Sequence, residues 1–495
     1  MTSPVSHLGV LVVIVPLLAA YCAELPWQAW RRASLRLATV TAAAVFGFCV
    51  LLAAQVMQKG ALLYAIGGRP APWGIEFLID PVAAYLLLGL SGIFFLVALF
   101  AEDELEAEIG EAGLPHFSAL YLLLEAALLG LVATNDLFNT FVFLEISAIA
   151  AVGLVALKND RLSIEAAYRY LILSTLGSGA FLFAIALLYA VTGHLNLEYL
   201  KQALAPALAS YPLSVAAALA MLLLGLMVKA ALYPLHIWLP DAHAAAPTPS
   251  SAILSGVVVE AYALVLLKLV LHLFPAPVAA SSAWRLPVLW ASTAAIFAGS
   301  LAAIREDDIK KMLAYSTVSQ VGYLLLGVGL LSRSGLLGSL LHVLNHAVVK
   351  AMLFLAAGAI IRSTGRRRVS EWQGVGLQAP LPAAAFAVGA LSMVGIPPLN
   401  GFISKWYLSL GALEARMPLY LWVVLLSSLL NAAYYIPVVV RCFLTPARAG
   451  LKAPSRPASA TAPLLVLALA TLLMGLFPSV QLGLVGRTVA AWAAR

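Results

Sequence analysis

The chain has 495 residues, of which 63% are hydrophobic and only 10% are charged, and its net charge is +7. Soluble domains carry about a quarter charged residues, so this composition excludes a soluble fold and predicts a polytopic membrane protein. The basic excess does not indicate a nucleic-acid partner, because most Lys and Arg residues fall in short loops, where they set membrane topology.

The sequence contains no motif for a cofactor, a metal or a nucleotide. Its three cysteines, Cys22, Cys49 and Cys442, are widely separated and form no CxxC or clustered His/Cys set. We therefore expect no haem, iron–sulfur cluster, structural zinc or other cofactor. A GxxxxGK[ST] motif is also missing, which argues against a nucleotide-driven pump. No catalytic residue is predicted, so an enzyme label would come only from a complex that the chain joins.

Apolar stretches long enough to cross a bilayer as helices recur along the whole chain. They predict one all-α membrane domain, 1–495, with about 14 transmembrane helices. The first stretch lacks a basic start and a clear cleavage site, so we expect a first span and not a removed signal. The predicted spans are centred at about residues 14, 46, 89, 124, 147, 180, 222, 262, 295, 322, 350, 393, 430 and 472.

Basic residues are concentrated in alternate loops. The richer set comprises Arg31, Arg32, Arg36, Lys158, Arg161, Arg169, Arg305, Lys310, Lys311, Arg362, Arg366, Arg367, Arg368, Arg441, Arg448, Lys452 and Arg456. The poorer set comprises Lys59, Arg69, Lys201, Arg285, Arg333, Arg416, Arg487 and Arg495. The positive-inside rule places the richer loops in the cytoplasm and both termini outside it. The acidic stretch "EDELEAEIGE", 102–111, falls on the cytoplasmic side.

Two carboxylates lie inside early spans, and a third lies at the mouth of one. Glu145 is mid-span in "LFNTFVFLEISAIAAVG". A charge inside the bilayer is costly, so Glu145 is expected to have a partner on another helix, such as Lys229. A helix-packing carboxylate held by hydrogen bonds is the alternative. Glu125 and Asp80 are expected to be structural or interfacial, and Glu125 is kept as an accessory candidate.

Four lysines, Lys229, Lys268, Lys350 and Lys405, lie within or near apolar spans. Placing such a charge at the bilayer centre costs about 2.5–3.5 kcal/mol on insertion scales. Lys268 is close to the end of its span, where its ammonium can reach the interface. The other three are predicted to serve function.

Helix-breaking prolines accompany two of these lysines. Lys229 is followed by Pro234 and Pro240, and "GIPPLNGFISK" places Pro397 and Pro398 just before Lys405. The two broken spans, the seventh and the twelfth, run in opposite directions in the predicted topology. Broken helices of this kind hold the ion sites of many secondary transporters. Prolines that merely kink a span are the alternative.

The matched breaks predict two inverted five-helix repeats, 113–275 and 286–445. Three helices, 1–112, precede them, and a C-terminal helix, 460–495, follows. A third titratable cluster lies in the second repeat, where His342, His346 and Lys350 recur every four residues in "LHVLNHAVVKAMLFL" and so share one helix face. Such a stripe suits stepwise proton transfer, since histidine changes charge near neutral pH. Interhelical hydrogen bonding is the alternative, and no second ligand pair favours metal binding.

Two further polar stretches are open to two interpretations each. The hydroxyl and amide groups of "AYSTVSQVGY", 314–323, either hold helices together or line a hydrated path. The mixed-charge loop from Arg305 to Lys311 is explained by a solvated face or by contact with another subunit.

Five ordered motifs carry a resemblance to a known family: "NDLFNTFVFLEIS", "KAALYPLHIWLPDAHAAAPTP", "REDDIKKMLAYSTVSQVGYLLLG", "HVLNHAVVKAMLFLAAG" and "GIPPLNGFISKW". Together they resemble the proton-translocating antiporter-like subunits of respiratory complex I, membrane-bound hydrogenases and Mrp-type cation/proton antiporters. The resemblance covers residues 75–445. The chain length looks most like the D-type subunit of Mrp antiporters or its hydrogenase relatives. The resemblance implies 14 helices, inverted repeats and a central chain of charged residues.

The resemblance also assigns roles. Glu145 looks like the helix 5 glutamate and Lys229 like its helix 7 partner; His342, His346 and Lys350 look like the helix 11 relay, and Lys405 like the terminal lysine of helix 12. The helix 7 motif adds His236, Asp241 and His243 as accessory candidates. One position departs from the family, because Glu260 stands where helix 8 usually carries a lysine. Lys268 lies more than two turns further on, and whether it substitutes is open.

The leading prediction is a proton-translocating subunit of a Mrp-type Na⁺/H⁺ antiporter in the bacterial inner membrane. Its expected partners are other membrane subunits, the lipid bilayer and protons, with Na⁺ left open. The homologous subunit of a hydrogenase or of a complex I-like oxidoreductase is the alternative. A non-conducting scaffold and a stand-alone transporter of an organic anion are further rivals.

Overall fold

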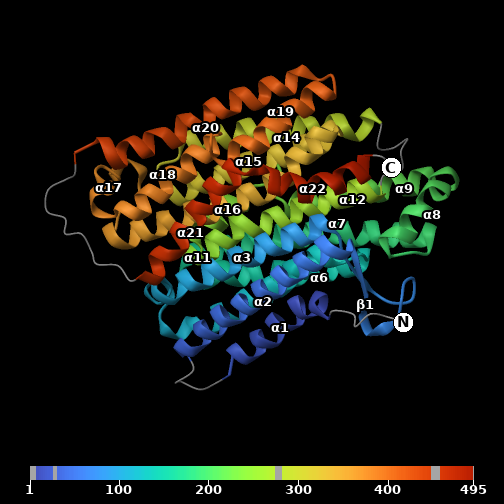
Figure 1. Ribbon diagram of the computed structural model, residues 1–495, viewed down its shortest axis with the longest axis horizontal. Coiled ribbons are helices and arrows are strands. Elements are labelled where there is room, and N and C mark those ends of the chain that lie inside the picture. The colour runs from blue at the N-terminus through green and yellow to red at the C-terminus, as the bar shows by residue number, and fades with distance from the viewer. Residues whose placement is uncertain (1–6, 26–30, 274–280, 447–457, 494–495) are drawn as a thin grey trace.

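The computed structural model describes residues 7–25, 31–273, 281–446 and 458–493, which form a helical bundle with one small hairpin (Figure 1). Arg448, Lys452, Arg456 and Arg495, used above for topology, lie outside these ranges. The first half comprises α1 (Leu8–Ala23), α2 (Arg31–Lys59), β1 (Leu62–Ala65), β2 (Glu76–Ile79), α3 (Pro81–Glu104), α4 (Glu106–Ile109), α5 (Leu114–Ala133), α6 (Leu137–Ala156), α7 (Arg161–Thr192), α8 (Leu197–Ser210), α9 (Pro212–Lys229), α10 (Leu239–Ala245), α11 (Thr248–Ile253), the π-helical turn η4 (Leu254–Val258) and α12 (Val259–Leu273).

The second half is helical throughout its described length. It comprises α14 (Ser282–Arg305), α15 (Ile309–Leu330), α16 (Arg333–Thr364), α17 (Val375–Gln378), α18 (Pro380–Val394), α19 (Asn400–Glu414), α20 (Pro418–Leu444), α21 (Ala458–Leu476) and α22 (Pro478–Ala493). Three short 3-10 turns, Ile66–Gly68, Glu111–Gly113 and Val369–Glu371, complete the list.

Every predicted span centre falls in a helix, but the predicted count of spans is not confirmed. Among the described residues, 11 helices are long and apolar enough to cross a membrane, or 12 if the bent C-terminal pair is one span. Three of the remaining helices are shorter: α1 has 16 residues, and the two pieces of the second broken helix, α18 and α19, have 15 each. A single helix needs about 20 residues to cross the bilayer, so these three shorter helices are not included among the 11 or 12 spans.

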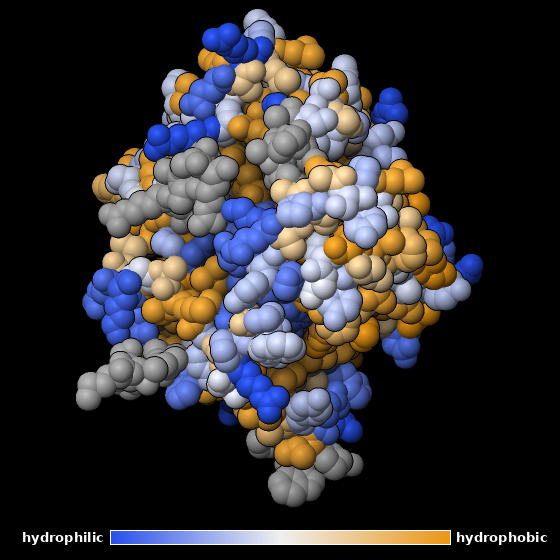
Figure 2. Space-filling model, turned by 90° about the vertical axis from the view of Figure 1, so that its right-hand side faces the viewer, coloured by the Kyte–Doolittle hydropathy of each residue, from blue (hydrophilic) through white to orange (hydrophobic). Residues whose placement is uncertain are grey.

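Three elements were not anticipated from the sequence. The antiparallel hairpin β1–β2 follows α2, and α8 adds a helix between the sixth and seventh predicted spans. Where one C-terminal helix was expected, the chain bends by 73° between Thr461–Leu476 and Pro478–Gly486. Figure 2 views the bundle from the end that carries the hairpin, and hydrophilic residues run down the middle of this face with apolar residues on its flanks.

Both predicted helix breaks are present, and local chemistry accounts for them. α18 ends at Gly395, whose φ of 94° is a left-handed conformation that favours glycine, and Ile396 N–H closes the helix by donating to Leu391 O. Pro397 and Pro398 then offer no amide to continue the helix. In the first break, Ala231 is left-handed and Pro234 follows. Pro240 is not in the break, because it lies in the first turn of α10.

The broken helices surround a buried centre. α16, with 32 residues, is buried along nearly all its length and contacts α15, α18 and α19, whereas α6 and α7 are buried on one side only. In Figure 1, α16 lies between the N-terminal helices α1 and α2 at one edge and α20 at the other. The predicted relay histidines therefore lie in the middle of the bundle, and Glu145 lies nearer its surface.

We expect Gly475→Ala to destabilise the protein by about 1–3 kcal/mol, the usual range for overpacking. A Cβ at Gly475 would lie 2.0 Å from Pro398 O and 2.6 Å from the Leu399 carbonyl carbon, both backbone atoms of the second break. Thermal unfolding in detergent measures the change. Gly47→Ala in α2 is the matched control, since its Cβ would meet nothing within 4 Å; equal melting temperatures for the two variants would contradict this packing.

Candidate functional site

The two residues that the sequence pairs across the first half are in contact. Lys229, the last residue of α9, places its Nζ 3.0 Å from Glu145 Oε1 on α6. The lysine side chain is only 2% exposed. Its ammonium is therefore shielded from solvent and lipid, and the Glu145 carboxylate stabilises its charge. The pairing is therefore a structural fact, while a role in proton transfer stays a prediction.

Two serines of α7 complete this pair. Lys229 Nζ donates to Ser174 Oγ at 2.9 Å, and Ser178 donates to the Glu145 carboxylate. They are four residues apart and thus lie on one face of α7. Ser174 and Ser178 were not predicted as site residues, although two serines at helical spacing in an apolar span are a detectable signal.

The break after Lys229 is closed by an aromatic residue. Trp238 Nε1–H donates to Val228 O at 3.1 Å, and the same carbonyl also accepts from Ala231 N–H at 3.1 Å. The Trp238 ring stacks on Tyr170 of α7, with centroids 4.0 Å apart. The broken helix is thereby held against the helix that carries Ser174.

Glu145 is less enclosed than its partner. Its side chain is 31% exposed, and it shares its face of α6 with Phe138 and Ile149, both exposed. A carboxylate facing lipid is costly, so this face requires cover. The α6 face is therefore the exposed side of the Glu145–Lys229 pair.

The centre of the second half holds a carboxylate–imidazole pair. Glu260 Oε1 on α12 lies 2.5 Å from His346 Nδ1 on α16, and both side chains are fully buried. The two atoms are in ion-pair contact but do not meet the angles of a hydrogen bond. At this distance no water or other group lies between the carboxylate and the imidazole. Glu260, which stands where the family usually has a lysine, is thus in direct contact with the predicted histidine relay.

A hydrogen bond links the helices of the two carboxylates. Ser147, two residues after Glu145, and Tyr262, two residues after Glu260, have their hydroxyl oxygens 2.9 Å apart. Both groups are buried. The first pair and the second pair therefore belong to adjacent, connected helices.

From His346 the chain of polar groups continues to Lys405. The His342 and His346 rings stack with centroids 5.7 Å apart, and His342 Nδ1 lies 2.9 Å from Ser404 Oγ. Lys405 Nζ donates to Met393 O and Val394 O at 2.7 and 3.2 Å. These carbonyls lie at the end of α18, which is the negative end of the helix dipole, and Met393 O also accepts from Asn431 Nδ2 at 3.2 Å.

A cavity of about 10 Å³ adjoins these groups, and it is lined by Gln320, His342, Asn345, His346, Val349, Ser392, Met393, Gly401 and Lys405. Such a volume is about that of one water. Both side-chain atoms of Gln320 and the Nε2 atoms of the two histidines are buried without a protein partner. The site has the polarity and the size for an ordered water to link the rings.

Lys350, the third residue of the predicted stripe, is held by α15, and its role in proton transfer stays a prediction. Its Nζ donates to Leu313 O at 2.7 Å and to Ser316 Oγ, both on α15, and Ser316 Oγ lies 3.0 Å from Tyr435 O–H. The helical drift over eight residues turns the Lys350 ammonium toward α15, while the residue stays within electrostatic range of Glu260 and His346. The polar stretch 314–323 has features of both interpretations offered above. Ser319 holds two helices together through its contact with Ser300 on α14, and Gln320 lines the small polar cavity.

The accessory candidates lie elsewhere. Lys268 donates to Thr134 O at 2.6 Å, close to the start of α6, and makes no hydrogen bond or ion pair with Glu260. Asp241 bridges Arg169 and Lys311 at the surface. The other three are buried or partly buried groups with unpartnered atoms: His236, His243 and Glu125. No group of three or more His, Cys, Asp or Glu side chains in the described ranges is arranged to hold a metal.

Residues 134–431, more than half of the chain, match the family described as NADH:quinone oxidoreductase/Mrp antiporter, TM. The chain belongs to this family. It is an antiporter-like, proton-translocating membrane subunit of the kind found in Mrp, complex I and hydrogenase-type complexes. Subunits of this family sit among other membrane subunits, and the chain is a multi-pass membrane protein.

Individual relatives refine the comparison. NADH-quinone oxidoreductase subunit N of Desulforudis audaxviator is 41% identical over 95% of this chain and 96% of its own length. Among solved structures, a chain of the membrane-bound sulfane sulfur reductase, an archaeal respiratory membrane complex, matches with TM-score 0.90, 29% identity and 99% coverage of both chains. A chain of the Mrp complex from Dietzia sp. matches with TM-score 0.86 and 27% identity over 99% of this antiporter-like subunit and 98% of that chain. The specific prediction of a Mrp D-type subunit is therefore not favoured.

Proposed function

We propose that this antiporter-like subunit carries protons within a respiratory complex related to NADH-quinone oxidoreductase. The observation that carries the proposal is the chain of titratable groups, buried except at Glu145, which begins with Glu145 and Lys229 and continues through Glu260, His346 and His342 to Lys405. A non-conducting scaffold would not require such groups in the bilayer, where each is costly. We propose that the two helix breaks mark equivalent places in two inverted repeats, 113–275 and 286–445; the 32-residue helices α7 and α16 each occupy the third place.

In this mechanism the Glu145 carboxylate stabilises the Lys229 ammonium, and the proton is released when that stabilisation is withdrawn. The imidazoles of His346 and His342 then accept and pass on a proton, because each ring has two nitrogens that can exchange it. Glu260 balances a charge on His346. Lys405, held by the carbonyl ends of α18, is the last group of the chain.

The exposure of Glu145 favours a function in which this chain is one subunit of a larger membrane complex. Since 31% of this side chain is uncovered, a neighbouring membrane subunit is needed to shield it from lipid. A change of charge in that neighbour would also act directly on the Glu145–Lys229 pair, which is how a distant redox reaction could drive release. A stand-alone transporter of an organic anion would not require this contact.

Purification of the intact complex tests the proposal. We expect quinone-reductase subunits to copurify with the chain, and the complex in vesicles to move protons when supplied with an electron donor and a quinone. Proton movement that instead requires a Na⁺ gradient would assign the chain to a Mrp-type antiporter. A complex that transfers electrons without moving protons through this chain would establish the scaffold.

A further inference from the structure

The turn between the short helices α10 and α11, residues 244–248, lies between the two carboxylate pairs along the chain. α10 follows the break after Lys229, and α11 continues through η4 into α12, which carries Glu260. α10 has only seven residues, too few to be stable by itself, whereas α11 is the first part of one continuous helix, Thr248–Leu273, that carries Glu260. The position of this turn must therefore be set by contacts with the rest of the protein.

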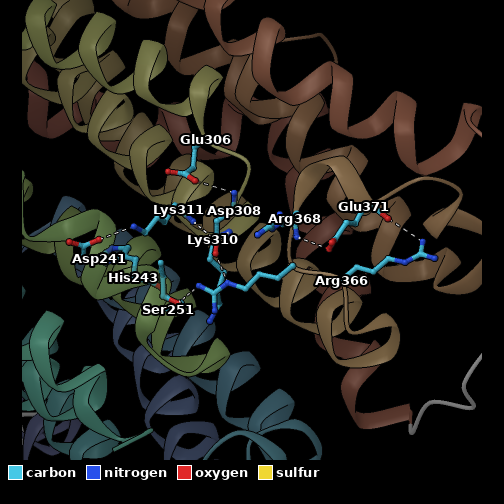
Figure 3. Close-up of polar contacts among 12 residues, drawn as sticks. Asp241, His243, Ser251, Glu306, Asp308, Lys310, Lys311, Arg366, Arg368 and Glu371 are labelled. Atoms are coloured by element: carbon cyan, nitrogen blue, oxygen red, sulfur yellow. Dashed lines mark hydrogen bonds and ion pairs between the residues drawn. The ribbon is translucent and has the colours of Figure 1, made fainter. Parts of the chain in front are cut away.

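Two basic residues hold the end of α10. Lys310 Nζ donates to Ala246 O at 2.8 Å, and Arg367 donates to Ala244 O at 2.9 Å. Lys310 is 2% exposed, although the sequence places it in a loop expected to be solvated or covered by another subunit. Cations at the carbonyl end of a helix are favourable because they oppose its dipole. Figure 3 shows Lys310 and Lys311 reaching from the start of α15 toward the segment with Asp241, His243 and Ser251.

A carboxylate holds the start of α11. Glu108, in α4, accepts from Thr248 N–H at 3.0 Å and pairs with Lys158 at 2.9 Å. Burial by itself would raise the pKa of the Glu108 carboxyl, but the ammonium groups of Lys310 and Lys158 outweigh it and lower the pKa to about 2. Glu108 is thus an anion at the amide end of a helix, which is again the favourable sign.

We propose that Glu108, Lys310 and Arg367, here called the turn clamp, are positioning residues that fix the α10–α11 turn and so the placement of Lys229 relative to Glu260. The clamp draws on three separate parts of the chain: α4, the start of α15, and the loop after α16. This inference rests on the proposed proton pathway, because the clamp touches neither carboxylate pair directly. The acidic loop, 102–111, and the basic loops that carry Lys310 and Arg367 thus make contacts within this subunit.

Glu108→Gln and Arg367→Gln in the whole complex test the clamp. We expect amide hydrogen exchange across 241–253 to become about fivefold faster, the size expected when a partly buried charge at a helix end is lost. We also expect proton flux per electron to fall about threefold at an unchanged electron-transfer rate, since displaced groups lose their transfer geometry. Glu106→Gln, on the same short helix but paired with exposed Arg32, and Arg368→Gln, at an exposed neighbour, should change neither quantity.

Unchanged exchange in both clamp variants would overturn the clamp, whatever transport does. Faster exchange with a full proton-to-electron ratio would also overturn the inference, because the turn would then be mobile without consequence for proton transfer. Full proton flux in Lys229→Ala would remove the proposed pathway, and hydrogen exchange in the clamp variants would still test whether the clamp fixes the turn.

Discussion

Lys229→Ala is expected to abolish proton movement through this subunit. The ammonium is buried at the end of α9, and its removal leaves Glu145 without the cation 3.0 Å away. The variant also lacks the only group at this position that can bind and release a proton, so the proposed transfer from Lys229 cannot take place. Redox-driven acidification of vesicles that contain the whole complex measures the effect, and Lys59→Ala, at the exposed end of α2, is the control.

A second variant separates loss of the proton carrier from loss of the charge. Lys229→Arg keeps a cation beside Glu145, so the pair and the fold should survive, but a guanidinium does not release its proton at physiological pH. We expect normal assembly and proton flux as low as in the alanine variant. Full flux with arginine would show that Lys229 acts only as a fixed charge, and full flux with alanine would remove the proposed pathway.

Glu260→Gln is expected to lower proton flux about a hundredfold, the lower end of what one positioned proton-transfer group contributes. Glutamine keeps the shape and the polarity of the side chain but cannot balance a charge on His346, 2.5 Å away in the wild type. Flux in vesicles and the amount of assembled complex are both measured, so that a folding defect is recognised. Glu198→Gln, at an exposed carboxylate of α8, should have no effect.

Two further variants test the pairing itself. If Glu260 and His346 act as a unit, the double variant Glu260→Gln/His346→Gln should transport no worse than either single variant, since residues in one network are not additive. Glu260→Lys restores the residue type that the family resemblance leads one to expect, but it places a cation beside His346. We expect it to transport poorly; unchanged transport in both Glu260→Gln and Glu260→Lys would show that this position is structural.

Most of the fold follows from the sequence because membrane helices leave a strong local signal. About 20 consecutive apolar residues are enough to identify a span, and every predicted centre lies in a helix. The breaks near Pro234 and Pro397 were also predicted, because proline removes a backbone donor wherever it occurs. The count of 14 spans went beyond this signal, since length and apolarity support 11 or 12 in the described chain.

The composition of the site was predicted better than its contacts. Glu145 and Lys229 were paired correctly, since a charge in a bilayer needs an opposite charge and few are available. Lys350 was placed with His342 and His346 because the three share a spacing, yet its ammonium bonds to α15. Ser174, Ser178 and Ser404 were missed, because serine in a span has many roles and its partner lies far away in sequence.

By itself, the sequence determined that this is a membrane protein with buried charges at two broken helices. Both properties depend on local chemistry: the run of apolar residues, the missing amide of proline and the cost of a charge in lipid. Only the tertiary structure decided that Glu260 meets His346 and that Lys310 and Glu108 hold the turn between α10 and α11. Such contacts join residues separated by scores of positions in the chain, and helix packing, which no local pattern encodes, brings them together.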